Sequence, residues 1–249
     1  MKIIICGICG KMGENLLELL KDDGAEVVCG VDIASSSETG VPVYGSFEEI
    51  KESADVIIDF SSPAVLKSEM EWAIKHNTPV VLATTGYSGE QLEYIDKCAD
   101  KIAVFKTANF SLGINLLVKL VKETARVLGE KFDIEIIEKH HGKKADAPSG
   151  TALMLADSAN SAFENRKDYL CGREGAVSKR GREIGIHAVR GGTIVGEHEV
   201  LFAGEDEIIT LSHSARSKKV FASGAIKAAK WIVGKPAGKY DMNDILKNL

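Results

Sequence analysis

The chain has 249 residues, of which 45% are hydrophobic and 27% charged, with 5 prolines, and this is the composition of an ordinary globular protein rather than a disordered one. Its length allows one large or two modest domains and excludes a short peptide-like module. The formal net charge of −5 gives no overall positive field toward nucleic acid or an anionic membrane surface.

The N-terminus and the cysteines indicate the compartment. No apolar run approaches the roughly 20 residues of a membrane span, and residues 1–7 pass into a turn too early for a signal peptide. Five cysteines are an odd number at scattered positions, so we expect reduced thiols and a cytoplasmic protein. Cys6 and Cys9 form a C-x-x-C motif. We interpret Cys6 as the end of a buried strand and Cys9 as part of a turn; a redox or metal role is the weaker alternative, because no second ligand pair follows.

In the first half of the chain, short apolar runs alternate with longer segments of helical period. The predicted strands cover 2–6, 26–31, 55–60, 79–83 and 102–106, and the predicted helices cover 11–21, 63–76, 88–100 and 113–130. Runs as apolar as 56–58 and 80–82 suit a parallel sheet that is covered on both faces. This rhythm predicts an α/β domain with a Rossmann-type doubly wound parallel sheet.

After residue 132 the rhythm changes to consecutive strands. Strands are predicted at 133–138, 184–189, 197–202 and 207–214, with a helix at 151–162, so we expect an α+β domain with a mixed sheet. A final helix at 220–232 can pack back on the first domain. We therefore assign residues 1–109 and 216–249 to a dinucleotide-binding domain and residues 110–215 to a second domain.

The loop between the first strand and the first helix is a candidate phosphate site. Glycines 7, 10 and 13 follow the pattern G-x-x-G-x-x-G, which is looser than G-x-G-x-x-G. A tight turn there lets backbone N–H groups and the positive helix end approach a pyrophosphate. Asp32, at the end of the second strand, can accept hydrogen bonds from the adenosine ribose. The alternative is a structural turn beside an exposed aspartate.

Asp32 also bears on the choice of nicotinamide cofactor. Its charge repels a 2′-phosphate, and the next residue, Ile33, supplies no cation to neutralise one. The sequence therefore favours NADH. Lys11, beside the loop, is a cation that can reach a 2′-phosphate, so NADPH stays open as a second cofactor.

The stretch 138–152 concentrates charge directly before a predicted helix. Six of its first seven residues are ionisable, which makes a local positive site in an acidic protein. The pair His140 and His141 with nearby lysines suits a small, multiply charged acid, because a histidine can deliver a proton and a lysine can orient a carboxylate.

The same stretch contains the signals of a helix start. Asp146 or Ser149 can cap the helix, and Pro148 suits its first turn. The N–H groups of Gly150 and Thr151 would then point at an anion. Together with the basic residues before them, these groups predict a pocket for an anionic substrate.

Two alternatives for this stretch are a solvated charged face and a nucleic-acid patch. Its place in the domain opposite a dinucleotide site weakens both. His140 and His141 form no obvious metal site, because neighbouring residues of an extended chain face opposite sides and no carboxylate stands at ligand spacing. We expect no metal. The other histidines (76, 187, 198 and 213) receive no chemical role.

Two polar loops each follow a predicted parallel strand and so lie at the ligand edge of the sheet. They are residues 83–86 and 107–110, whose backbone and hydroxyl groups can hold a nicotinamide carboxamide. The alternative is a pair of ordinary strand-to-helix turns.

Over nearly its whole length the sequence resembles the 4-hydroxy-tetrahydrodipicolinate reductase family, also called dihydrodipicolinate reductase. The segments that carry the resemblance are 7–13, 83–86, 108–111, 138–152, 191–198 and 221–225. The run 146–151 after a histidine pair is highly specific to that family. The resemblance implies NAD(P)H-dependent reduction of (2S,4S)-4-hydroxy-2,3,4,5-tetrahydrodipicolinate to tetrahydrodipicolinate on the diaminopimelate route to lysine.

The resemblance also implies roles for single residues. His140 and Lys144 would be catalytic, with His140 the proton donor. The substrate contacts would be His141, Lys144, Gly150 and Thr151. The cofactor contacts would be Gly7, Ile8, Cys9, Gly10, Lys11, Met12, Asp32, Ala83, Thr84, Thr85, Thr107, Ala108, Asn109 and Phe110. Residues 110–215 would bind substrate and assemble the usual homotetramer, with a small cyclic dicarboxylate as substrate and no nucleic-acid or membrane partner.

Four positions depart from common family residues. Gly142 and Lys143 stand where many relatives have Arg and His, and Ala83 replaces a frequent Gly. Ser62 replaces a residue that is Arg in some members, which removes a further phosphate-binding cation and supports NADH.

Two other functions compete with this interpretation. A dinucleotide-sensing regulatory module without catalysis would keep the glycine loop and Asp32 but would not need His140 and Lys144. A semialdehyde dehydrogenase would need a nucleophilic cysteine at a strand-to-helix turn, and Cys98 and Cys171 are poorly placed for that role.

Overall fold

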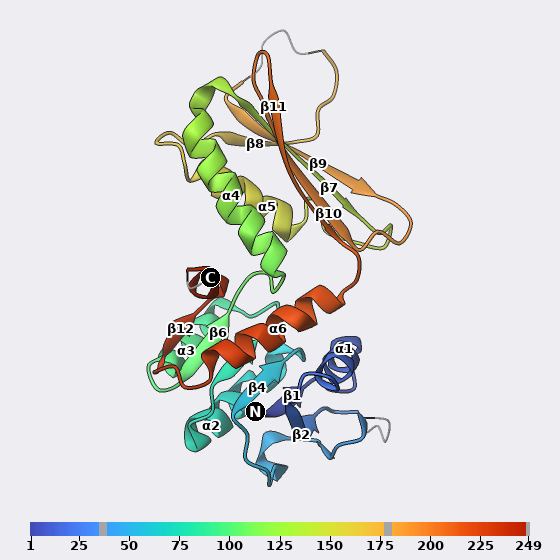
Figure 1. Ribbon diagram of the computed structural model, residues 1–249, viewed down its shortest axis with the longest axis vertical. Helices are drawn as coiled ribbons and strands as arrows, with labels where there is room; N and C mark the ends of the chain where they lie inside the picture. Colours follow the sequence, from blue (N-terminus) through green and yellow to red (C-terminus); the bar gives the residue numbers. More distant parts are fainter. Residues whose placement is uncertain (35–38, 177–180, 248–249) are drawn as a thin grey trace. The chain divides into compact units, whose positions relative to one another are not determined.

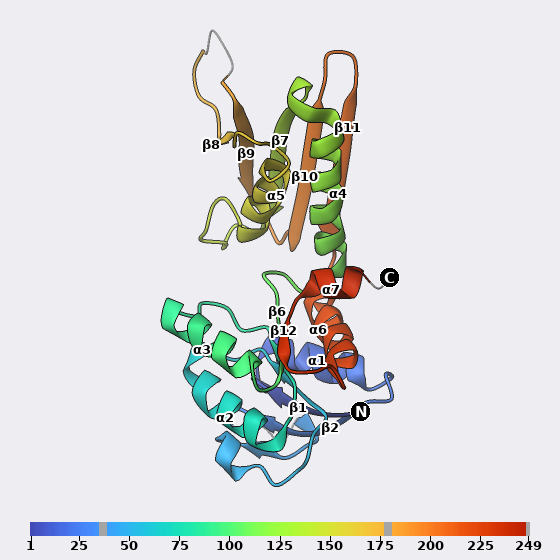
Figure 2. The ribbon, with the colours of Figure 1, turned by 90° about the vertical axis from the view of Figure 1, so that its left-hand side faces the viewer.

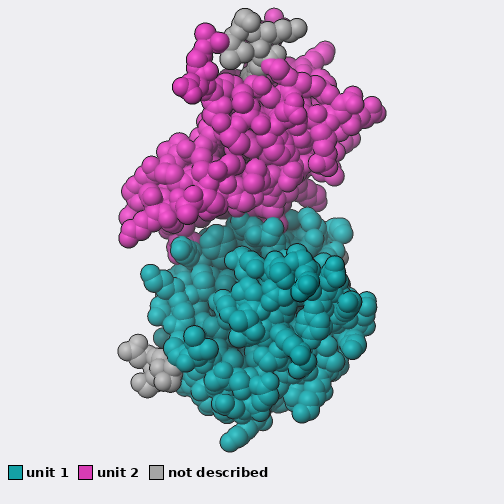
Figure 3. Space-filling model, turned by 180° about the vertical axis from the view of Figure 1, so that it is seen from behind, with its two compact units in different colours: residues 1–111, 218–249 teal, residues 112–217 magenta. Residues whose placement is uncertain are grey.

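The computed structural model describes residues 1–34, 39–176 and 181–247. The chain divides into two compact units, residues 1–111 with 218–249 and residues 112–217 (Figure 3). The first unit is thus built from both ends of the chain, and the second is inserted between them.

The first unit contains a parallel sheet with the strand order β12-β6-β5-β4-β1-β2-β3. Its strands are β1 (Lys2–Cys6), β2 (Glu26–Val31), β3 (Val43–Tyr44), β4 (Val56–Asp59), β5 (Val80–Leu82), β6 (Ala103–Lys106) and β12 (Gly238–Tyr240). The apolar runs that predict the central strands are fully buried. β3 and β12 were not predicted from the sequence, because two or three residues carry too little periodicity to be recognised.

Helices cover both faces of this sheet, as Figures 1 and 2 show. The pair α1 (Lys11–Leu20) and α6 (Lys219–Ile232) lies on one face, and α2 (Leu66–His76) and α3 (Gly89–Ala99) lie on the other. Two short 3-10 helices, η2 (Phe47–Glu49) and η3 (Pro63–Val65), precede β4 and α2, and the short α7 (Met242–Leu246) follows β12. Ser88 caps α3 through a reciprocal capping box with Gln91, which explains the clean start of that helix.

The order of the strands reverses at β1. From β1 the chain builds β2 and β3 on one side and then β4, β5 and β6 on the other. In open α/β sheets this reversal leaves a crevice at the carboxyl ends of the strands, and ligands bind there. The glycine loop after β1 lies at that point.

The second unit contains a mixed sheet with the order β11-β10-β7-β9-β8. Its strands are β7 (Asp133–His140), β8 (Asp168–Cys171), β9 (Glu183–Arg190), β10 (Gly196–Ala203) and β11 (Ile208–Ala215). β9 runs parallel to β7 and β8, whereas β10 runs antiparallel to β7 and β11. The α/β class with a second mixed-sheet domain, predicted from the sequence, is confirmed.

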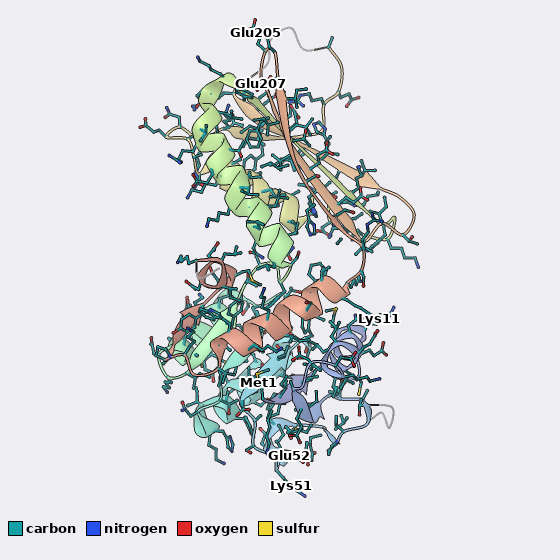
Figure 4. The ribbon with its side chains drawn as sticks, in the orientation of Figure 1. Met1, Lys11, Lys51, Glu52, Glu205 and Glu207 are labelled. Carbon is teal, nitrogen blue, oxygen red and sulfur yellow. The ribbon has the colours of Figure 1, made fainter. Side chains whose placement is uncertain are left out.

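Helices α4 (Leu112–Leu128) and α5 (Gly150–Asn160) pack together on one face of this sheet (Figures 1 and 2). They bury alternate residues of the strands, such as Ile134, Ile136, Val200 and Phe202. The 3-10 helix η4 (Gly129–Lys131) joins α4 to β7. The other face of the sheet has no helix over it among the described residues. Glu205 and Glu207 mark the exposed turn between β10 and β11 (Figure 4).

Within the described residues, no helix combines the length and the apolar character that crossing a membrane requires.

Candidate active site

The glycine loop after β1 tolerates only glycine at two of its three glycine positions. Gly7 has φ +79°, and a Cβ there would lie 2.7 Å from the carbonyl oxygen of Phe60. A Cβ at Gly13 would lie 2.2 Å from the carbonyl oxygen of Ile8. Because the obstructing atoms belong to the backbone, a side chain cannot be accommodated. The turn therefore brings the chain tightly over the start of α1, which is the geometry of a phosphate cradle.

The carboxylate of Asp32 is tied directly to this loop. Its Oδ2 accepts a hydrogen bond from the N–H of Cys9 at 3.0 Å, and its Oδ1 accepts one from the N–H of Ala34 at 3.0 Å. Asp32 therefore lies at the crevice with a fixed orientation. A cavity of about 270 Å³ opens beside it, and Ile33 at its edge is 98% exposed. The cavity is lined by Cys6, Gly7, Gly10, Val31, Asp32, Ile33, Gly45, Phe60, Ser61, Ser62 and Val65.

The two polar loops lie at the carboxyl ends of β5 and β6, as expected. In the second, Thr107 donates its hydroxyl to the carbonyl oxygen of Asn109 at 3.3 Å, so the turn closes on itself. Phe110 is buried, with ring centroids 6.1 Å from Phe60 and 6.0 Å from Phe105. The ring of Phe110 therefore serves packing, and only its backbone could contact a cofactor.

Below these loops lies a buried acidic cluster that sequence analysis did not identify. Asp59 ends β4 and accepts hydrogen bonds from the N–H of Ser61 at 2.8 Å and the hydroxyl of Tyr87 at 3.2 Å. Glu69 on α2 is fully buried, and its carboxyl oxygens have no hydrogen-bond partner among the described residues. Burial, and then the charge of Asp59, raises the pKa of Glu69 well above its usual range.

In the second unit, a buried carboxylate organises the end of β7. Glu138 is 0% exposed, and its Oε2 lies 2.6 Å from Nδ1 of His140. Its Oε1 accepts a hydrogen bond from the N–H of Ser149 at 2.9 Å. Arg190 on β9 donates to both oxygens, at 2.7 Å each. Glu138 thereby joins the predicted proton donor to Ser149, the residue directly before α5.

The charges around Glu138 balance its burial. Burial alone would raise its pKa, but the hydrogen bonds from Arg190, His140 and Ser149 outweigh this effect and hold the pKa of Glu138 below its usual range. Glu138 is therefore an ionised carboxylate at neutral pH. Arg190 also donates to the carbonyl oxygen of Asp146 at 2.7 Å, so the same guanidinium fixes the loop after β7.

His198 on β10 packs its ring edgewise against that of His140, with centroids 5.2 Å apart. Its Nε2 lies 3.2 Å from the hydroxyl of Ser149. Burial, followed by the charge of His140, lowers the pKa of His198 to about 4. His198 is therefore a neutral imidazole at neutral pH. Nothing in the sequence assigned it a chemical role, and its contact with His140 was not predicted.

The loop 141–149 carries the remaining predicted residues. Lys144 pairs with Asp146, Nζ to Oδ1 at 2.7 Å. Ser149 is the N-cap of α5, since its hydroxyl accepts the N–H of Ala152 at 3.2 Å. The first turn of α5 thus begins at Gly150, with Thr151 next. Two expectations need correction here. Asp146, one of the two candidate caps, does not cap the helix. Pro148 lies before the cap and not in the first turn, because the helix begins at Gly150, two residues after the proline.

A further motif segment, residues 191–198, lies at the same end of β7. Gly191 donates its N–H to the carbonyl oxygen of His140 at 2.9 Å, and Gly142 donates to Gly192 at 3.3 Å. The segment 191–198 therefore lies beside the end of β7, and it forms one surface with the stretch 138–152.

The fold of the first unit defines the class of protein to which the chain belongs. A parallel sheet whose order reverses at a glycine loop, with an acid on the next strand, is the nucleotide-binding half of a two-unit dinucleotide-dependent oxidoreductase. Comparisons with known proteins narrow this class. The family model described as "Dihydrodipicolinate reductase, N-terminus" matches residues 1–110, and the model described as "Dihydrodipicolinate reductase, C-terminus" matches residues 113–246. The chain belongs to the dihydrodipicolinate reductase family.

Full-length relatives agree with both models. The 4-hydroxy-tetrahydrodipicolinate reductase of Caldanaerobacter subterraneus subsp. tengcongensis is 51% identical over 99% of this chain and 98% of its own length. The enzyme of Clostridium novyi with the same description is 45% identical over 99% and 98%. The solved structure of a dipicolinate-bound dihydrodipicolinate reductase from Paenisporosarcina sp. TG-14 superimposes with a TM-score of 0.80 at 26% identity, covering 98% of each chain.

The family resemblance seen in the sequence is thus confirmed. The chain is an NAD(P)H-dependent oxidoreductase with 4-hydroxy-tetrahydrodipicolinate reductase activity, which serves diaminopimelate and lysine biosynthesis.

Proposed function

We propose that the glycine loop and Asp32 hold the dinucleotide, and that His140, Lys144 and the start of α5 hold and protonate the substrate. The proposal rests on the corner at the end of β7, by which we mean Glu138, His140, Ser149, Arg190 and His198. There the ionised carboxylate of Glu138 contacts both His140 and Ser149, the N-cap of α5.

The residues of the first unit fit a dinucleotide. The cradle that a Cβ at Gly7 or Gly13 would fill has room for a pyrophosphate against backbone N–H groups. Asp32, fixed by two backbone N–H groups, can accept hydrogen bonds from ribose hydroxyls on its remaining lone pairs. The loops 83–85 and 107–110 at neighbouring strand ends supply polar groups for the nicotinamide amide. When bound, the reduced cofactor supplies the hydride.

NADH is the proposed preferred cofactor. The Asp32 carboxylate would repel a 2′-phosphate, and both Ile33 and Ser62, which line the cavity beside it, are uncharged. Lys11 begins α1 and is the cation that would support NADPH as a second cofactor. The ratio of kcat/KM for the two cofactors tests the proposal, and Asp32→Ser should raise the share of NADPH. A native preference for NADPH would refute it.

The second unit suits a cyclic dicarboxylate. The N–H groups at the start of α5, including those of Gly150 and Thr151, carry the positive end of the helix, and Lys144 and His141 add cationic and donor groups in the loop before it. We propose that a substrate carboxylate displaces Asp146 from Lys144 on binding. The Paenisporosarcina enzyme was solved with dipicolinate, a ligand of this chemical class.

In this arrangement, different residues bind the substrate and protonate it. Lys144, His141, Gly150 and Thr151 bind and orient the substrate. His140 delivers a proton to the ring carbon beside the one that accepts the hydride. A cation and helix N–H groups near the carboxylates would also stabilise negative charge that develops on the ring.

The test is oxidation of NADH and NADPH by the purified protein with 4-hydroxy-tetrahydrodipicolinate, for the native chain, His140→Ala and Lys144→Ala. We expect both variants to lose kcat by at least about 100-fold while NADH affinity stays unchanged. Glu164→Ala, which alters an exposed residue after α5, is the control. Full activity of His140→Ala would refute the proposed proton donor, and a loss of NADH binding in either variant would refute the division between the two units.

We also propose that the chain forms a homotetramer through the helix-free face of the second sheet. Side chains such as Leu201 and the exposed Val189 and Ile208 make that face partly apolar. Sedimentation should give four times the mass of the chain, and Leu201→Asp should give a smaller species. A native monomer would refute the proposal.

A further inference from the structure

We infer that Glu138 is a positioning residue that fixes the ring of His140 so that Nε2, and not Nδ1, delivers the proton. The inference rests on the proposed role of His140 as the proton donor. It adds a residue that acts only through that histidine.

The contacts of Glu138 determine which nitrogen of His140 carries the fixed proton. An ionised carboxylate only accepts hydrogen bonds. Its oxygens already receive two N–H groups of Arg190 and the N–H of Ser149, and Oε2 lies 2.6 Å from Nδ1 of His140. Nδ1 must therefore be the donor in that contact. Glu138 selects the form of His140 that is protonated at Nδ1, as the carboxylate does in a Ser-His-Asp triad.

The opposite edge of the ring is left open. Among the described residues, Nε2 of His140 has no hydrogen-bond partner. Residue 196, where β10 begins, is glycine, and a Cβ there would lie 3.2 Å from this nitrogen. A side chain at that position would crowd Nε2. The sequence thus keeps open the one nitrogen of His140 that Glu138 does not occupy.

The proton transfer balances with these residues. His140 starts as the imidazolium, protonated on both nitrogens. The electron pair that forms the new C–H bond comes from the substrate carbon made electron-rich by hydride delivery to its neighbour. The Nε2–H bond breaks and leaves its pair on Nε2. His140 becomes a neutral imidazole with its proton on Nδ1, Glu138 stays ionised throughout, and solvent restores the proton before the next turnover.

Charged neighbours make this carboxylate necessary. The titratable and charged groups on the elements around His140 are Glu138 on β7, Arg190 on β9, His198 on β10, and Lys144 and Asp146 in the loop after β7. The cations Arg190 and Lys144 disfavour an imidazolium. Glu138 is the carboxylate in contact with the ring, and its negative charge opposes that of the two cations.

The experiment is a double-mutant cycle between Glu138→Gln and His140→Gln, with kcat and KM measured from pH 5.5 to 9. Glutamine keeps the volume of Glu138 and removes its charge. We expect Glu138→Gln to lower kcat about 10- to 100-fold with little change in KM. The fall of kcat at alkaline pH should move to lower pH, because the charged ring of His140 loses its counter-charge. In the His140→Gln background the same substitution should change kcat by less than about twofold.

The control is Glu130→Gln, which removes another carboxylate that holds cations, Lys167 and Arg182, but lies outside the corner at the end of β7. It should leave kcat and its pH profile unchanged. An equal loss of kcat from Glu138→Gln in both backgrounds would overturn the inference, since Glu138 would then act on the fold and not through His140. If His140→Gln itself keeps full kcat, the proposed proton donor fails, and the inference falls with it.

A measurement on the native protein covers the case in which Glu138→Gln fails to fold. Histidine-selective ¹⁵N NMR, with His140 assigned from the spectrum of His140→Gln, reports the protonation of each ring nitrogen. We expect Nδ1 of His140 to stay protonated across the titration while Nε2 changes state. A neutral form protonated at Nε2 would refute the inference.

Discussion

The neutral state of His198 predicts a specific pH dependence of stability. Burial lowers the pKa of this imidazole to about 4, against 6.5 for an exposed histidine. As the pH falls below about 6.5, the unfolded chain takes up a proton at this position and the folded chain does not. The free energy of unfolding contributed by His198 is therefore complete above pH 6.5 and is lost progressively as the pH falls toward 4.

The size of this effect follows from the shift. Each unit of pKa difference corresponds to about 1.4 kcal/mol. Between pH 7.5 and 4.5, most of the shift of His198 is expressed, so the linkage costs the second unit about 2–3 kcal/mol. His198→Gln cannot titrate. Its stability should therefore fall by about 2–3 kcal/mol less than that of the native chain over the same pH range, whatever the substitution costs at pH 7.5.

The assay must report the second unit alone. Both tryptophans, Trp72 and Trp231, belong to the first unit, so their fluorescence does not follow β10. Hydrogen exchange of the β7 and β10 amides in increasing urea, corrected for intrinsic exchange rates, gives the free energy of unfolding of the second unit at each pH. Between pH 7.5 and 9 the two proteins should show the same dependence, which is the internal control. Equal losses of stability between pH 7.5 and 4.5 would refute the claim that burial keeps His198 neutral.

Three further predictions concern other parts of the molecule. Gly13→Ala should reduce NADH affinity by at least about tenfold in calorimetry, because its Cβ would collide with backbone, whereas Gly89→Ala at the start of α3 meets no atom within 4 Å and should bind normally. Gly196→Ala should lower kcat by about tenfold and leave NADH affinity unchanged, because the new methyl group crowds Nε2 of His140; an unchanged kcat would contradict the open edge. Burial raises the pKa of Glu69. Its contribution to the free energy of unfolding is therefore complete below pH 4.5 and is lost as the pH rises through the raised pKa. Glu69→Gln should therefore gain stability over the native chain as the pH rises from 4 to 8, measured by tryptophan fluorescence in urea, and a gap that stays constant with pH would contradict a buried, titrating carboxyl.

Local pattern predicted the parts of the fold that local forces determine. Apolar runs identified the buried strands. Gly7 and Gly13 of the first loop could be interpreted, because a positive φ at Gly7 and backbone collisions at both positions leave no other residue possible there. Ser149 was predicted as one of two caps, since both candidates carry a suitable oxygen. The choice between them depends on where the turn closes, which residue types alone do not determine.

The organisation of the corner at the end of β7 was beyond the sequence analysis because it depends on strand order. Glu138 appeared there as one more charge in a basic stretch. It becomes the centre of the site because β9 brings Arg190 to one side and β10 brings His198 to the other. The alternation of β10 indicates that His198 faces inward, but it does not identify its neighbour. A glutamate in the inward-facing alternation after Ile134 and Ile136, two positions before a histidine, was the available signal.

The insertion of the second unit into the first has a consequence for biosynthesis. A ribosome releases residues 112–217 before it has made residues 218–249, which supply α6 and β12. The sheet of the first unit then lacks an edge strand, and one of its faces lacks a helix, while the second unit already has every strand and helix it needs. During synthesis, the second unit can therefore fold before the first unit is complete. The incomplete first unit exposes apolar surface, so it is the part with most need of a chaperone.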